Sequence, residues 1–183
     1  GASATGGAGA TDFHVTSLAD SGAGTLREAI DQTLNSYTTR CVVFDVAGEL
    51  VLNNSINIRG ASGLTIDGFS APSPWITITA GATFPFSAMF FIASGDNNVI
   101  IRGVRIDGGD RWNGLAEPND QGSTTLSVSV NATTGVVLDH LSLRRAGNDT
   151  INFGDGSGGI TFSNSIISKR GTTIHPTGGF GDS

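Results

Sequence analysis

Four of the ten basic residues in this 183-residue chain fall in two short clusters toward its C-terminal end. The clusters are Arg144-Arg145 and Lys169-Arg170, and Arg145 precedes Lys169 by 24 residues. Arginine and lysine bind carboxylates, and arginine can do so through two parallel hydrogen bonds. We therefore expect these residues to bind an acidic polysaccharide. The alternative is that they are solvated edge charges, with Asp149 as their partner.

A polar stretch over residues 107–122 is the second candidate for chemistry. Its Trp112 could stack on a sugar ring. Calcium is bound by several hard oxygen ligands, which makes it the candidate cofactor here. The candidate calcium ligands are the acids of this stretch and one later acid: Asp107, Asp110, Glu117, Asp120 and Asp149. Because their spacing matches no EF-hand loop, a solvated connection without metal is the alternative.

Composition argues against several other classes of function. The net charge of -6 disfavours nucleic acid or an anionic membrane as the main partner. The histidines at 14, 140 and 175 lack the spacing of a zinc site. No apolar run approaches the roughly 20 residues that cross a bilayer. We therefore expect a soluble protein without a membrane span or zinc chemistry, whose partner is not nucleic acid.

An internal repeat in the sequence indicates which elements would position these residues. Apolar residues of 135–143 match those of 159–167 at a shift of 24 residues, and the same frame recurs at 98–106 and 63–69, after shifts of 37 and 35. Each unit has two short alternating strands around a bend, and fixed periods indicate stacked coils. The bend positions hold residues that tolerate a turn conformation: Gly68, Gly103, His140 and Asn164. The sequence thus predicts an all-β solenoid, a parallel β-helix.

The two ends of the chain are expected to differ. Residues 25–34 begin with a Thr-x-x-Glu capping box and predict a short amphipathic helix that plugs the N-terminal end, before a first strand at 42–46. Residues 1–11 are predicted to be a flexible low-complexity segment ahead of a β-helix domain at 12–183. No capping segment follows Ile174, so the domain is interpreted as C-terminally incomplete. We expect this end to self-associate, as an oligomer or filament, or by accepting a strand from residues 1–11 of a neighbour.

The order of these motifs resembles the opening of pectate-lyase-like proteins. The likeness is carried by residues 15–30, by Val42 to Gly48 and Leu64 to Gly68, and then by 99–106, 137–143 and 160–164. It extends from residue 12 to about residue 175. The resemblance implies a right-handed parallel β-helix that is secreted and acts outside the cell or at its surface.

In that family, an arginine base and bound Ca²⁺ cleave uronate glycans by β-elimination. The resemblance places calcium ligands at 124–130, where this chain has no carboxylate, and near Asp149. It places a lysine near Arg170 and the arginine base after residue 183. The leading hypothesis is therefore a non-catalytic protein that binds polysaccharide or self-assembles. The alternative is an active calcium-dependent pectate-type lyase.

Overall fold

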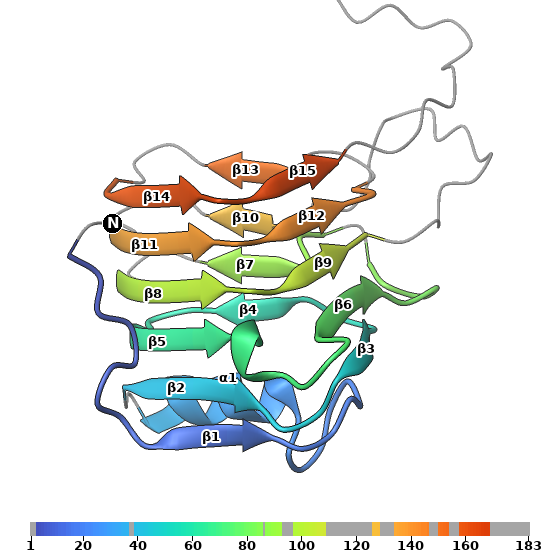
Figure 1. Cartoon of the computed structure of the whole chain (residues 1–183), viewed down its shortest axis with the longest axis horizontal. Helices are drawn as coiled ribbons and strands as arrows, with labels where there is room; N and C mark the ends of the chain where they lie inside the picture. The colour runs from blue at the N-terminus through green and yellow to red at the C-terminus, as the bar shows by residue number, and fades with distance from the viewer. Residues whose placement is uncertain are drawn as a thin grey trace, which may run out of the picture.

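Short parallel strands stacked in coils form the framework of the described part of the chain (Figure 1). The computed structural model describes residues 3–36, 39–85, 87–92, 97–108, 126–128, 134–146, 150–153 and 158–168. The described strands form three parallel sheets. From residue 40 onward, successive strands along the chain belong to different sheets, so that each coil adds one strand to each sheet. The prediction of a right-handed parallel β-helix is confirmed.

We name the sheets A, B and C. Sheet A has the order β1 (Asp12–Val15), β2 (Arg40–Phe44), β5 (Ser62–Asp67), β8 (Asn97–Arg102), β11 (Thr134–Asp139), β14 (Ile160–Ser163). Sheet B has the order β3 (Gly48–Leu52), β6 (Ile76–Ala80), β9 (Arg105–Asp107), β12 (Ser142–Arg144), β15 (Ile166–Ser168). Sheet C has the order β4 (Ile56–Ile58), β7 (Phe90–Ile92), β10 (Leu126–Val128), β13 (Ile151–Phe153).

The strand register follows the repeat of the sequence. Leu64 pairs with Val99, Val99 with Val136, and Val136 with Ile160. These pairs reproduce the predicted shifts of 35, 37 and 24 residues. Because side chains alternate along a strand, every second residue of each strand points into the coil. The buried residues of all three sheets therefore form one continuous apolar core.

The bends between sheets A and B stack on one another. Gly103, His140 and Asn164 all adopt left-handed backbone conformations, with φ of 65°, 50° and 47°. The bend amides bond to the next coil, Gly103 N donating to Asp139 O and His140 N to Ser163 O. The expectation for these three positions is confirmed. Gly68 differs, because it begins a 3-10 turn, η1 (Gly68–Ser70).

The predicted helix closes the N-terminal end of the solenoid. Helix α1 spans Leu26–Ser36, and Thr25 Oγ1 accepts a hydrogen bond from Glu28 N while the Glu28 carboxylate accepts one from Gly24 N. Its Leu26, Ala29 and Ile30 are buried in the core. The predicted position of the first strand was wrong. Strand β1 precedes the helix and pairs with β2, which covers a sheet edge that would otherwise be open.

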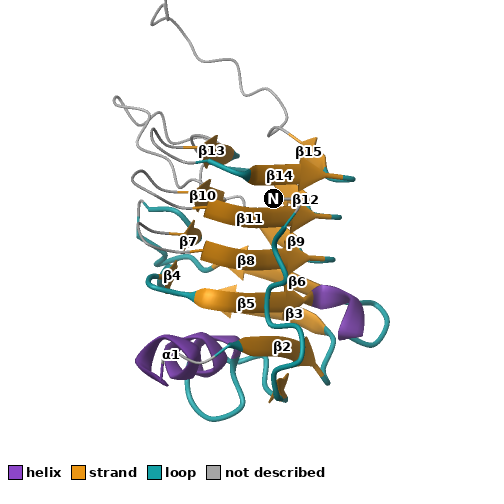
Figure 2. Ribbon diagram, turned by 90° about the vertical axis from the view of Figure 1, so that its left-hand side faces the viewer, coloured by secondary structure: helices purple, strands orange, loops and turns teal. Residues whose placement is uncertain are grey.

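The segment before β1 lies across the outer face of sheet A (Figure 2). Thr5 N and Gly6 N both donate to Asn98 Oδ1 on β8, and Gly7 N donates to Thr65 Oγ1 on β5. These bonds join residues 5–7 to two coils of sheet A, while the flexibility expected of residues 1–11 stays a prediction. Small residues allow the backbone to approach a sheet this closely.

Two further expectations concern self-association at the C-terminal face and the absence of a membrane-spanning segment. Residues 169–183 lie outside the described residues, so self-association through the C-terminal face stays a prediction. Within the part of the chain that the structure describes, no helix has the length and apolar character needed to span a membrane.

Candidate functional site

The first candidate site lies where strands of sheet B end and the chain turns toward sheet C. Asp107 ends β9 and Arg144 ends β12, and the parallel register places them side by side. The Asp107 side chain is almost fully buried, with 1% of its surface exposed. A buried carboxylate needs charge partners and hydrogen bonds. The neighbouring strand supplies them.

Two arginines hold this carboxylate. Arg144 Nη2 donates to Asp107 Oδ2 at 2.6 Å. Arg145 makes a bidentate contact, with Nε 2.6 Å from Oδ1 and Nη2 2.8 Å from Oδ2. Arg145 reaches the carboxylate from a left-handed backbone conformation, with φ of 51°. A non-glycine residue in this region carries a strain that its surroundings must hold in place.

The cluster of Asp107, Arg144 and Arg145 carries one net positive charge. The Arg144 side chain remains 47% exposed although its Nη2 is bonded to Asp107. A guanidinium has five N–H donors in a planar fork, so this side chain has capacity for a second anion. The arrangement can therefore bind a carboxylate from solution at the edge where sheet B leads to sheet C.

The structure changes the interpretation of three predicted residues. Arg144 and Arg145 bind Asp107 of the preceding coil, a partner that the sequence did not suggest. Their suggested partner Asp149 lies outside the described residues, so that pairing stays a prediction. Asp107 was a candidate calcium ligand, but both of its oxygens accept hydrogen bonds from guanidinium groups. A cation at this carboxylate would have to displace those groups, so the residue does not fit a calcium site.

The remaining predicted site residues lie outside the described residues. They are Trp112, Lys169 and Arg170 among the proposed glycan contacts, and Asp110, Glu117, Asp120 and Asp149 among the proposed calcium ligands. Ser168 pairs with Arg144, which is consistent with the predicted 24-residue register toward Lys169. Among the described residues, no group of three or more potential metal ligands comes together. The calcium site that the resemblance implies, at 124–130 and near Asp149, falls mostly on residues outside the described ones, so it stays a prediction.

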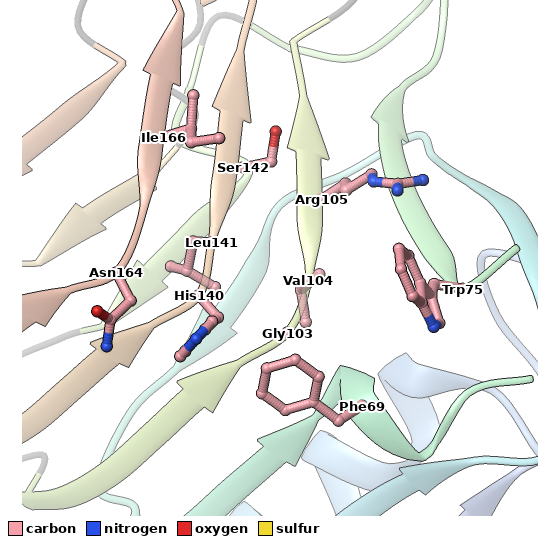
Figure 3. Close-up of a pocket in the computed structure, with 10 residues that line it drawn as sticks. All are labelled: Phe69, Trp75, Gly103, Val104, Arg105, His140, Leu141, Ser142, Asn164 and Ile166. Atoms are coloured by element: carbon pink, nitrogen blue, oxygen red, sulfur yellow. The ribbon is translucent and has the colours of Figure 1, made fainter. Parts of the chain in front are cut away.

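A second candidate site lies at the stacked bends between sheets A and B (Figure 3). It is a groove of about 210 Å³, which we call the bend groove, lined by Phe69, Trp75, Arg105, His140, Asn164 and Ile166 among others. The sequence reasoning assigned no function to the bends beyond stacking. The sequence did carry one sign of this groove. Residues 69–75 form a longer connection than the later bends, and they have an aromatic residue at each end, Phe69 and Trp75.

A polar cluster stands beside the bend groove. Asp139 accepts hydrogen bonds from Ser163 Oγ at 2.7 Å and Asn164 Nδ2 at 2.9 Å, and its Oδ2 lies 2.7 Å from His140 Nδ1. The hydrogen bond with His140 and then that with Ser163 lower the pKa of Asp139 to about 2. The Asn164 side chain thus bonds to the neighbouring coil. The His140 ring instead bonds within its own coil and contacts Phe69 edge-on at 5.3 Å.

Similarity to known proteins bears on the class of protein. No family model matches the chain. Proteins named probable pectate lyase C are similar to it over 179 residues, or 98% of the chain: those of Aspergillus terreus at 31% identity, Emericella nidulans at 30% and Aspergillus fumigatus at 31%. The chain spans 37% of the length of each of these relatives. Taken with the three parallel sheets, this similarity supports membership of the chain in the pectate lyase superfamily of parallel β-helix proteins.

Proposed function

We propose that this chain acts in a pectate-type polysaccharide lyase, which cleaves uronate glycans by β-elimination. The observation that carries the proposal is the similarity to proteins named pectate lyase over 98% of the chain. It favours the lyase alternative over the non-catalytic hypothesis. Because the chain spans about a third of those relatives, its substrate and activity are proposed here for the protein to which these coils belong.

The chemistry of β-elimination determines which groups the protein must supply. A base removes the proton at C5 of a uronate, its electron pair forms the C4–C5 double bond, and the bond from C4 to the glycosidic oxygen breaks. That oxygen leaves with the neighbouring sugar and takes up a proton. The substrate is a polyanion, so the protein must bind carboxylates as well as supply a base.

The cluster of Asp107, Arg144 and Arg145 suits the binding part of this task. Its net charge is positive, and Arg144 is half exposed. Asp107 orients both guanidiniums, which lowers the entropy lost when a substrate carboxylate binds. We assign no step of the elimination to a described residue. Arg144 is proposed as a substrate-binding residue, with Asp107 as its positioning residue.

The test is turnover of polygalacturonate by the whole protein to which these coils belong, followed by the ultraviolet absorbance of the unsaturated product, with Ca²⁺ added. We expect product to form. Arg144→Gln should lower kcat/KM about tenfold or more, because a charge-assisted hydrogen bond contributes about 1.5 to 3 kcal/mol. Arg59→Gln is the control, since Arg59 is an exposed arginine elsewhere on the surface. Absence of product would contradict the proposal and favour the non-catalytic hypothesis.

Action on such a glycan also implies where the protein works. Uronate polysaccharides are polymers that lie outside the cell membrane, and the sequence carries few charged residues and many glycines, as extracellular β proteins do. We therefore infer an extracellular location. Recovery of the native protein from the cell interior and not from the medium would contradict it.

A further inference from the structure

The bend groove lies at a different corner of the solenoid from the Asp107 cluster. It follows the bends where sheet A passes into sheet B, whereas the Asp107 cluster lies where sheet B leads to sheet C. Figure 3 shows Trp75 and Arg105 at one end, His140 and Asn164 at the other, and Phe69 between them. The groove therefore crosses several coils.

The two aromatic side chains are presented by a long connection between β5 and β6. Later bends between sheets A and B are tight, such as Gly103-Val104 between β8 and β9, whereas this connection runs over residues 68–75. Asp67 Oδ1 accepts a hydrogen bond from Phe69 N, and Phe44 N donates to Ser70 Oγ at 2.7 Å. These bonds fix the turn that carries Phe69 outward.

Trp75 is held at the surface at an energetic cost. Its φ is 74°, which is a genuine outlier for a bulky side chain. Trp75 N donates to Pro72 O, and Trp75 O accepts from Gly48 N, so the strained backbone is bonded on both sides. Phe69 and Trp75 are 55% and 53% exposed. Strained backbone that presents an exposed apolar ring is a feature of ligand sites.

The charge in the groove is positive. The Arg105 guanidinium lies 5.2 Å from the centroid of the Trp75 ring, and its Nη1 donates to Pro74 O at 3.4 Å. No carboxylate among the described residues forms an ion pair with Arg105. The nearby acids are already engaged, Asp67 by Arg102 and Asp139 by its own hydrogen bonds. An anion is thus the complementary ligand.

We propose that the bend groove binds a segment of an acidic polysaccharide, at a different corner of the solenoid from the Asp107 cluster. A sugar presents an apolar ring face, hydroxyl groups and, in a uronate, a carboxylate. The ring faces match Trp75 and Phe69, the carboxylate matches Arg105, and the hydroxyls match the polar groups of His140 and Asn164. The inference goes beyond the lyase proposal, since binding at this groove requires no turnover.

The test is calorimetric titration of the 183-residue chain with oligogalacturonate and with its methyl ester, which lacks the charge. We expect the acid form to bind, and to bind less tightly as salt rises. Trp75→Ala and Arg105→Gln should each weaken binding about tenfold. The matched control is Arg59→Gln, because Arg59 lies 5.7 Å over the Phe91 ring outside the groove. Circular dichroism melts verify that each variant is folded.

Several results would overturn the inference. One is equal binding of the acid and ester forms, and another is binding that neither variant changes. A third is self-association that rises with protein concentration and is abolished by Trp75→Ala. The groove, with the exposed Ile166 at its edge, would then be a contact between copies of the chain and not a glycan site. Lyase turnover is measured separately, so loss of activity with binding intact would refute the lyase proposal alone.

Discussion

At the scale of single residues, Asp139 shows how one carboxylate connects neighbouring coils. Its oxygens lie within hydrogen-bond distance of donors on its own bend and on the next coil, from His140, Ser163 and Asn164. Arg102 lies beside it on β8. The ionised form of Asp139 is therefore stabilised by the fold, and part of the folding energy depends on its charge.

This dependence predicts a loss of stability in acid. The folded pKa of Asp139 is about 2, below its ordinary value of 3.8. The contribution is complete above pH 3.8 and is lost as the pH falls toward 2. We expect the melting temperature of the wild type to fall more steeply over this interval than that of Asp139→Asn. Glu49→Gln, on an exposed position of β3, should follow the wild type. Parallel curves for all three would show that Asp139 is not stabilised as described.

At the scale of elements, the stacked bends decide how closely coils can approach. Gly103 lies against the 3-10 turn of the preceding coil. A Cβ at this position would lie 2.8 Å from Phe69 N and 2.9 Å from the Phe69 ring. Its φ of 65° also favours glycine. The bend between β8 and β9 therefore requires glycine for both its conformation and its contact.

Two glycine variants separate these requirements. Gly60 has a φ of 74°, and a Cβ added there would have no atom within 4 Å, so Gly60→Ala carries the conformational cost alone, about 1 to 2 kcal/mol. Gly103→Ala adds a steric conflict, and we expect a further loss of about 1 to 3 kcal/mol in the free energy of unfolding. Denaturant titration measures both. Equal losses would mean that the η1 turn shifts freely away from Gly103.

At the scale of the whole molecule, stability comes from columns of apolar side chains that run through the coils. In sheet A, one column contains Val42, Ile66, Ile101 and Leu138, all fully buried, and continues to the partly buried Phe162. Each coil contacts its neighbours, so the energy is distributed along the solenoid. A residue in the middle of a column contributes to two interfaces between coils.

The column predicts a graded response to truncation. Leu138→Ala should cost about 2 to 5 kcal/mol, because the cavity lies between two other coils. Phe162→Ala should lower the free energy of unfolding by less than truncation of a fully buried phenylalanine does, because Phe162 is partly exposed. Val137→Ala, on the opposite face of the same strand, should cost less than about 1 kcal/mol. A Val137 variant as unstable as Leu138→Ala would show that the inward assignment of β11 is wrong.

The solenoid could be predicted from the sequence alone. Repeated apolar alternation is a local property, and matching patterns around Val99, Val136 and Ile160 leave one parallel register that buries all of them. The capping box of α1 was equally readable, because its residues contact one another within one turn. Strand β1 was missed because its four residues are too short to show a period.

The two candidate sites depend on contacts that appear only in three dimensions. Asp107 and Arg145 are far apart in sequence, and their pairing depends on which strand ends the coil stacking brings together. For the same reason a predicted metal ligand proved to be the partner of two arginines. The bend groove combines Phe69, Trp75, Arg105 and His140 from three coils, so no local pattern could reveal it. Spacing predicts which residues face inward, whereas contacts between coils decide which outward residues meet.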